Sequence, residues 1–280
     1  WMEMYNEAQL TRNPGATPKY SQLDIDNTRN QVNPYIYPDV QWKDVIFKNM
    51  NMNQRANVNI SGGGSKASYY MSLQANHDTG LLDTKKVYSY NNNINNWGYN
   101  FQNNISYKIT STTKIDLHMN AQIRNKKGPN YSTSDLFAQM LYCNPINFPV
   151  TFQPGDTHIR FGNAIWTGSS VRTNPYAYML SSFKEYNENT LNTSLKINQK
   201  LDFVTKGLSV QAMVNWKNWA SSSYNRTIEP YYYGIKGGSY NPSNPTDYEI
   251  ERLGTSGTDY LKTSDISKAS DQTFYLDARV

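Results

Sequence analysis

Apolar and polar residues alternate one by one in several segments of this chain, and each segment is close to the length of a bilayer-crossing strand. In residues 67–77 one face carries Tyr69, Met71, Leu73 and Ala75, and the residues between them are polar. A two-residue period places alternate side chains on opposite faces of a strand. A tilted strand needs about 9–11 residues to cross a bilayer. The pattern therefore predicts strands with one apolar and one polar face.

The same alternation recurs six more times, and the connections between the segments differ in length. The further segments are 55–60, 101–109, 114–124, 191–203, 208–217 and 274–280. The short connections are 62–66, 110–113 and 205–207, and the long ones are 78–98, 125–189 and 221–272. Short turns on one side and long loops on the other are typical of outer-membrane barrels. We expect an all-β fold, an antiparallel transmembrane β-barrel segment of about seven strands with long extracellular loops and short periplasmic turns.

The domain organisation follows from where this alternation begins. Residues 1–54 are expected to form an extracellular loop or connector with short helices, and residues 55–280 a partial barrel. Helical spacing is confined to Met2–Leu10, Gln41–Lys48 and Asp135–Leu141, the last preceded by Ser134 as a cap. The connection 221–272 contains no predicted element, and loops of that length are usually functional or mobile.

Composition excludes several other classes of protein. The net charge is +5, from 27 Lys and Arg and 22 Asp and Glu, and the cations are scattered. Nucleic-acid binding is not expected, because neutralising phosphates requires clustered cations. The single cysteine, Cys143, excludes an intramolecular disulfide framework. A mean hydropathy of -0.75, without a run of about 18 apolar residues, excludes a transmembrane helix.

The two ends of the sequence suggest an internal piece of a longer protein. No export signal is visible in the first residues, and the last residues, Phe274 to Val280, are strand-like. About seven strands would also leave two open sheet edges, which lipid does not tolerate. We therefore expect further strands outside this sequence.

Several segments are specific in their order and spacing. They are Asn6-Glu7-Ala8, Pro18 to Ser21, Tyr37 to Phe47, Asn57 to Gly63, Lys66 to Leu73 and Thr79 to Leu82. In these segments the chain resembles the SusC/RagA-like TonB-linked outer-membrane transporters of Bacteroidetes. The resemblance covers most of the chain, and Asn174-Pro175-Tyr176 is a looser match.

This resemblance implies a TonB-dependent barrel of about 22 strands with a plug in its lumen, located in the bacterial outer membrane. The family imports oligosaccharides or peptides together with a SusD-like surface lipoprotein. TonB-ExbB-ExbD would act through an N-terminal region that this sequence does not contain. We expect oligosaccharide import, with peptide import as the alternative. A different class also remains open: a non-transporting, carbohydrate-binding β-sandwich would bury the same apolar faces against each other.

Aromatic residues near or in the long loops are the candidate ligand contacts. Aromatic faces offer platforms on which sugar rings stack, although the same side chains also pack loops or form interfacial girdles. Both interpretations apply to each of these residues. The candidates are Trp97, Trp166, Trp219, Tyr231, Tyr232 and Tyr233.

We find no residue pattern for catalysis or a firm metal site. No nucleophile, base and orienting group can be assembled, so an enzyme is not expected. The three histidines, His77, His118 and His158, lack zinc-ligand spacing. Asp24-Ile25-Asp26-Asn27 resembles the start of a calcium loop, but the required Gly and Glu are replaced by Arg29 and Tyr35. This leaves loop calcium open and predicts no other cofactor.

Overall fold

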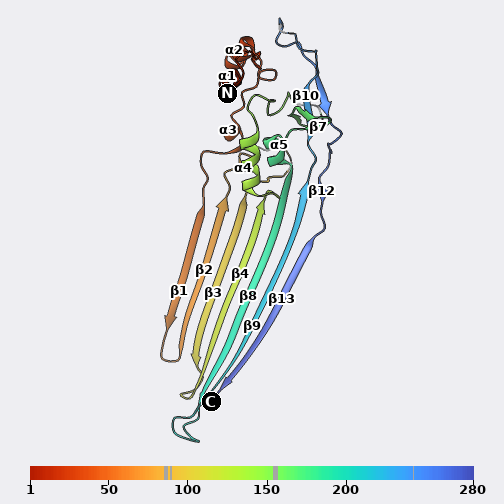
Figure 1. Cartoon of the computed structure of the whole chain (residues 1–280). Coiled ribbons are helices and arrows are strands. Elements are labelled where there is room, and N and C mark those ends of the chain that lie inside the picture. Colours follow the sequence, from red (N-terminus) through yellow and green to blue (C-terminus); the bar gives the residue numbers. More distant parts are fainter. Residues whose placement is uncertain (85–87, 89, 154–156, 242) are drawn as a thin grey trace. The chain divides into compact units, whose positions relative to one another are not determined.

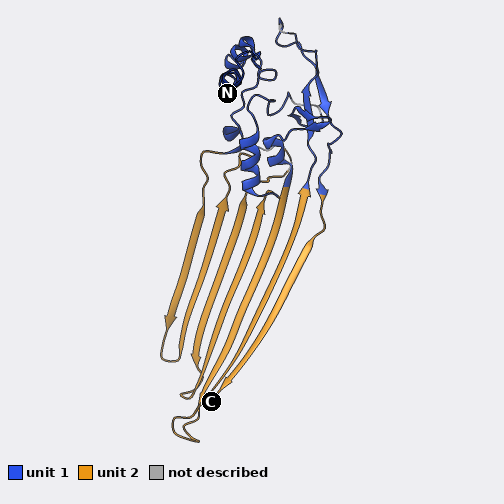
Figure 2. Ribbon diagram, viewed as in Figure 1, with its two compact units in different colours: residues 1–47, 131–182, 227–262 blue, residues 48–130, 183–226, 263–280 orange. Residues whose placement is uncertain are grey.

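The computed structural model describes residues 1–280 except 85–87, 89, 154–156 and 242. The chain divides into two compact units whose segments are interleaved in sequence (Figure 2). Unit 1 comprises residues 1–47, 131–182 and 227–262, and unit 2 comprises residues 48–130, 183–226 and 263–280. Each unit is therefore assembled from segments that are far apart along the chain.

The main element of unit 2 is an eight-stranded antiparallel sheet, which confirms the predicted all-β fold class (Figure 1). Its order is β1-β2-β3-β4-β8-β9-β12, and β13 also pairs with β9. The strands are β1 (Gln54–Gly63), β2 (Ala67–Thr79), β3 (Asn95–Lys108), β4 (Thr113–Gly128), β8 (Ser182–Lys200), β9 (Ser209–Thr227), β12 (Lys262–Thr263) and β13 (Ser267–Arg279). All seven segments with period-two alternation fall on these strands.

The register of the sheet aligns the alternating residues into rows, because directly paired residues lie on the same face. One row crosses five strands with apolar side chains only, and we name its side the apolar face. Its members are Val58, Leu73, Phe101, Ala121 and Leu191. The neighbouring row defines the polar face. Its members are Asn59, Ser72, Gln102, Asn120 and Asn192.

The strands are longer than predicted at the ends that adjoin the long connections. β3 begins at Asn95, β8 begins at Ser182, β9 continues to Thr227 and β13 begins at Ser267, so the predicted loops 78–98, 125–189 and 221–272 were too long. Apolar and polar residues no longer alternate one by one in these extensions, and stretches such as Asn187-Glu188-Asn189 are polar on both faces. The period-two alternation of apolar and polar residues therefore ends before the strand does.

Unit 1 contains the helices and several short strands. The helices are α1 (Met2–Arg12), α2 (Gln22–Arg29), α3 (Trp42–Ile46), α4 (Thr133–Tyr142) and α5 (Pro175–Leu180). The strands are β5 (Arg160–Gly162), β6 (Ile165–Thr167), β7 (Ser170–Val171), β10 (Tyr231–Ile235) and β11 (Ile250–Leu253). The connection 221–272, in which no element was predicted, thus contains β10, β11 and β12. Among the described residues, no helix has both the length and the apolar character needed to span a membrane.

Local capping explains the helices that periodicity did not predict. Ser21 and Asp24 form a reciprocal capping box at the start of α2. Asn174 caps α5: its Oδ1 accepts from the backbone N–H groups of Tyr176 and Ala177 at 2.9 and 3.1 Å. The predicted cap of α4 was wrong. Ser132, not Ser134, accepts from the backbone N–H of Asp135, because the helix begins one residue before Ser134.

The core of unit 1 lies around α5, against which both α3 and α4 pack. Trp42 and Phe148 meet edge to face, with ring centroids 5.9 Å apart. The fully buried Asn174 also donates to the backbone oxygens of Val150 and Gly162 at 2.9 and 2.8 Å. The apolar members of this core include Ile46, Leu136, Met140, Phe161, Ala177, Met179 and Leu180.

Candidate functional site

The polar face of the sheet carries a network of side-chain amides. Asn120 donates to Asn100 Oδ1 at 3.2 Å, and Asn215 donates to Asn192 Oδ1 at 2.9 Å. His118 Nδ1 and Asn104 Oδ1 are 3.0 Å apart. These groups border a shallow cavity of about 260 Å³ over β3, β4, β8 and β9. Amides both donate and accept, so this surface can exchange hydrogen bonds with hydroxyl or peptide groups.

Trp219 is one of the predicted ligand contacts, and it lies within β9 rather than in a loop. Its indole N–H donates to Glu188 Oε1 at 3.0 Å. Glu188 in turn lies 3.9 Å from the guanidinium of Arg124. All three side chains lie on the polar face, where the ring of Trp219 is held at a fixed point by its hydrogen bond.

Trp97, by contrast, lies on the apolar face. It belongs to β3 and stacks on His77, with ring centroids 4.1 Å apart, and on Tyr99 at 5.9 Å. This places Trp97 on the side of the sheet opposite Trp219. Its position at one end of the apolar rows is that of an interfacial aromatic residue in membrane barrels.

Tyr231 and Tyr233 lie in β10 of unit 1 and gather cationic and imidazole side chains around them. His158 stacks on Tyr231 at 4.0 Å, and its Nε2 is 2.7 Å from the Tyr233 hydroxyl. Arg252 lies over the Tyr231 ring at 4.9 Å, and Arg160 lies over the Tyr233 ring at 5.8 Å. We name these five residues the Tyr231 cluster.

The contacts of Tyr231 fix its orientation. Its hydroxyl donates to Asp259 Oδ1 at 2.9 Å, and this hydrogen bond raises the pKa of the Tyr231 phenol. Gly257, with φ at 137°, lies so close to the ring that a side chain there would collide with it. The Tyr231 ring is therefore partly covered by His158, Arg252 and Gly257.

The remaining predicted contacts lie apart from these groups. Tyr232 lies between Tyr231 and Tyr233 in β10, so its side chain is on the opposite face of the strand from theirs. Burial raises the pKa of the Tyr232 phenol to about 12. Trp166 lies in β6 and is 71% exposed, with the Arg172 guanidinium 5.7 Å from its ring centroid. Of the six predicted residues, the structure thus brings together only Tyr231 and Tyr233, on either side of Tyr232 in sequence. Both contact His158.

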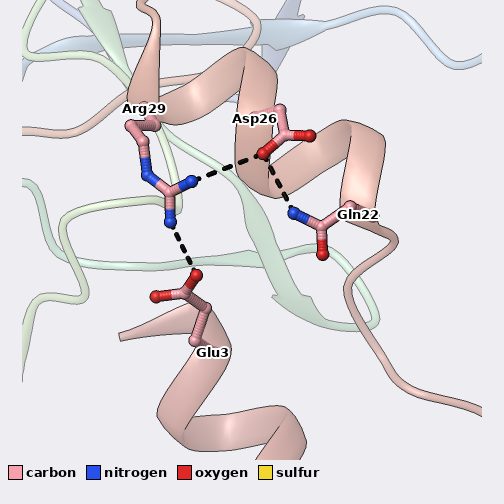
Figure 3. Close-up of polar contacts among 4 residues, drawn as sticks. All are labelled: Glu3, Gln22, Asp26 and Arg29. Carbon is pink, nitrogen blue, oxygen red and sulfur yellow. Dashed lines mark hydrogen bonds and ion pairs between the residues drawn. The ribbon is translucent and has the colours of Figure 1, made fainter.

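The acidic segment that suggested calcium is helical instead. Asp26 lies in α2, where its Oδ1 accepts from Gln22 at 2.9 Å and from Arg29 at 3.5 Å (Figure 3). Arg29 also contacts Glu3 of α1 at 2.6 Å, as Figure 3 shows. Asp24 belongs to the capping box. The two aspartates thus make their contacts within α2, and only the Glu3–Arg29 pair links α1 to α2. The described residues contain no group of three or more potential metal ligands.

Sequence reasoning did not find the residues that surround Tyr231 and Tyr233. His158 precedes β5, Arg160 is the first residue of β5, and Arg252 comes from β11. His158 is 75 residues away from Tyr233 in sequence. The three adjacent tyrosines pointed to β10, but a single sequence contains no signal for its pairing with β5.

Comparison with known proteins gives likenesses only among solved structures. No family model matches the chain, and no curated protein matches it. The RagAB peptide importer in its "open-open" state is 16% identical, with a TM-score of 0.49, over 81% of this chain and 26% of that chain. The same importer in its "closed-closed" state is 12% identical, with a TM-score of 0.37, over 89% of this chain and 32% of that chain.

The present chain thus spans about a quarter to a third of the length of those importer chains. At such low identity and TM-score, the likeness does not decide the function of this chain.

Proposed function

We propose that this chain is part of the wall of an outer-membrane β-barrel that imports oligosaccharides in a TonB-dependent manner, together with a SusD-like lipoprotein. The apolar face of the sheet would contact lipid, and the polar face would line the lumen. TonB-ExbB-ExbD would supply the energy through parts of the protein outside this sequence. Peptide import by the same kind of transporter is the alternative.

The observation that carries this proposal is the exposed band of apolar side chains on one face of the sheet. Val58 is 70% exposed, Leu73 53% and Leu276 75%. Along β2 the band runs from Ala67 to Ala75, which is about 27 Å of strand at ~3.4 Å per residue. Tilted by about 40°, this corresponds to a height of about 21 Å, close to the ~25 Å band of outer-membrane barrels.

Aromatic residues lie at both ends of this band. Tyr69 and Tyr107 lie toward the short turns, and Trp97 and Tyr99 lie toward the long connections. Trp216 and Phe274 pair across β9 and β13 on the same face. Membrane barrels carry such aromatic girdles at both interfaces. The alternative β-sandwich would need a second sheet on this face, and the described residues of unit 2 form only one sheet.

The polar face suits a polar cargo that forms hydrogen bonds. Its central rows consist mainly of Asn, Gln and Ser, and Trp219 offers an aromatic surface beside them. Oligosaccharides present hydroxyls for such amides and C–H faces for such rings. Peptides could use the same amides, so the choice of cargo requires a direct measurement.

The first experiment tests the barrel. The full-length protein is located by outer-membrane fractionation, solubilised in mild detergent and run on SDS gels with and without boiling. We expect it in the outer-membrane fraction, with migration that depends on heating and with a co-purifying lipoprotein. A protein that is soluble without detergent and shows no heat shift would instead support the sandwich.

The second experiment tests the cargo. Uptake of labelled oligosaccharides and of labelled peptides is measured in cells that have or lack TonB. TonB-dependent uptake of oligosaccharides alone supports the proposal. Uptake of peptides alone would replace the proposed cargo but leave the barrel assignment intact.

A further inference from the structure

Unit 1 contains a cavity, separate from the polar face of the sheet, which we name the Arg160 cavity. Its volume is about 480 Å³, within the ~300–1,000 Å³ range of small-ligand sites. Three chain segments form it: the loop after α2, the segment that leads to β5 and the segment that leads to β11. The residues that line it include Pro34, Tyr35, Phe152, Arg160, Pro245 and Tyr248.

Aromatic side chains form the walls of the Arg160 cavity. Tyr35 and Phe152 are stacked at 5.7 Å with an interplanar angle of 25°, and Tyr248 lies 6.2 Å from Tyr35. Two of the segments are tied together, because the Asn33 side-chain amide donates to the backbone oxygen of Pro245. Asn33 Oδ1 also accepts from the Tyr35 backbone N–H at 2.9 Å. The aromatic wall is therefore held by hydrogen bonds before any ligand arrives.

Among the described residues that line this cavity, Arg160 alone is charged. Its backbone is fixed in β5 by pairing with Tyr231 and by a 2.8 Å hydrogen bond from the Phe152 N–H to its carbonyl oxygen. The guanidinium lies over Tyr233 at 5.8 Å, so it places a positive charge beside the aromatic walls of the cavity.

We propose that the Arg160 cavity binds an acidic sugar residue, with its carboxylate on Arg160 and its ring against Tyr35, Phe152 and Tyr248. A guanidinium matches a carboxylate through two parallel hydrogen bonds, which a neutral hydroxyl cannot reproduce. Flat aromatic walls suit the C–H faces of a sugar ring. This inference rests on the proposed uptake of oligosaccharides and narrows that cargo to glycans containing uronic acids.

The lining favours an acidic sugar over a peptide for two reasons. An extended peptide is usually held by backbone hydrogen bonds along a strand edge. Pro34 and Pro245 line this cavity, and proline offers no backbone N–H. A peptide carboxy terminus could reach Arg160, but a short peptide also carries an ammonium group, and the lining residues include no carboxylate to receive it.

The test is equilibrium binding to the detergent-solubilised full-length protein, which does not depend on TonB. The probes are an oligogalacturonide, a neutral galactose oligomer of the same length and a short peptide with a free carboxy terminus. Arg160→Gln removes the charge, and Arg160→Lys keeps the charge but removes the two-pronged geometry. Arg12→Gln is the matched control, because the exposed Arg12 of α1 has the same charge and does not line the cavity.

We expect the oligogalacturonide to bind more tightly than the neutral oligomer, and to lose about 10-fold or more in affinity in Arg160→Gln. Arg160→Lys should give an intermediate loss, and Arg12→Gln should show none. Added salt should weaken oligogalacturonide binding without affecting any binding of the neutral oligomer. Heat-dependent migration of each variant establishes that it is folded.

Two results would overturn the inference. Equal affinity for acidic and neutral oligomers, or unchanged affinity in Arg160→Gln, would show that Arg160 does not receive a carboxylate. Arg160-dependent binding of the peptide alone would assign the cavity to peptide carboxylates. Either result can occur in a protein that still fractionates as an outer-membrane barrel, so failure of this inference differs from failure of the proposed function.

Discussion

The two units of this protein solve the problem of burying apolar surface in different ways. Unit 1 encloses a core of its own around α3, α4 and α5, with Ile46, Leu136 and Met179 almost fully buried. The sheet of unit 2 leaves its apolar face exposed along the strands, as at Val58 and Leu276. The difference indicates that unit 1 gains its stability from internal packing, whereas the sheet needs an apolar environment that the described residues do not supply.

The largest expected effect is on the stability of unit 1. Asn174→Ala removes the cap of α5 and the side-chain donor to the backbone oxygens of Val150 and Gly162, of which the Val150 oxygen keeps the Gly162 N–H at 3.2 Å. We expect a loss of about 4 kcal/mol, from the cap and two buried hydrogen bonds. Hydrogen exchange of the α5 amides measures it. Asn174→Asp keeps the capping oxygen but sets a buried carboxylate oxygen against both carbonyl oxygens, so it should lose at least as much; a clearly smaller loss would contradict this account.

The second prediction tests the apolar face of the sheet. Leu117 pairs with Ile105 and Leu195 in an apolar row. In the full-length protein Leu117→Arg should cost about 2–4 kcal/mol if this row lies near mid-bilayer. Folding yield into lipid vesicles is the measurement. His118→Arg, on the polar face, is the matched control and should be tolerated; equal yields for both variants would argue against a lipid-facing band.

A smaller effect is expected where Trp219 meets Glu188. Trp219→Phe removes the indole donor of a 3.0 Å hydrogen bond but keeps an aromatic ring. We expect a loss of about 1 kcal/mol in stability, with oligosaccharide binding retained. Trp219→Ala should weaken binding as well. Trp216→Ala, on the apolar face, should leave binding unchanged, and an effect on binding there would contradict the assignment of the faces.

The smallest effect concerns a surface ion pair in unit 1. Lys262 contacts Glu229 and holds the pKa of Glu229 below its ordinary value of 4.5, while Glu229 raises the pKa of Lys262 above 10.5. The pair should stabilise the local structure between these values. Its contribution is lost as pH falls through the depressed pKa of Glu229 and as pH rises through the raised pKa of Lys262.

Protease cleavage between Thr258 and Lys262 measures this pH dependence. Both groups are solvent-exposed, so we expect only a modest rise in cleavage rate below about pH 4.5. Lys262→Gln should remove the dependence in the acid range. Persistence of the same dependence in that variant would show that another group is responsible.

How far the sequence predicts this structure depends on what each segment packs against. Strand segments with one apolar face, such as 114–124, were predicted almost to their ends. Their polar extensions were missed, because Asn187 and Glu188 give no contrast between the two faces. Capping residues such as Ser21 signal a helix only once the reciprocal contact with Asp24 is considered.

The candidate sites were less predictable than the strands. Trp219 and Tyr231 were identified as aromatic residues able to contact a ligand, but not with their partners Glu188 and Asp259. The cationic character of the Arg160 cavity depends on β5 pairing with β10, which brings Arg160 beside Tyr231 from 71 residues away. Such pairings depend on tertiary structure, which periodicity along one chain does not encode.

The interleaving of the units has a consequence for the order of folding. Neighbouring strands from β1 to β4 pair across short sequence separations, such as Gly63 with Ser68 in the first hairpin. Unit 1 is completed only when Asn33 meets Pro245, which is 212 residues later. Because distant contacts form more slowly than local ones, the hairpins should appear early and unit 1 should mature last. A chain released before residue 245 would thus contain paired strands but an unfinished unit 1.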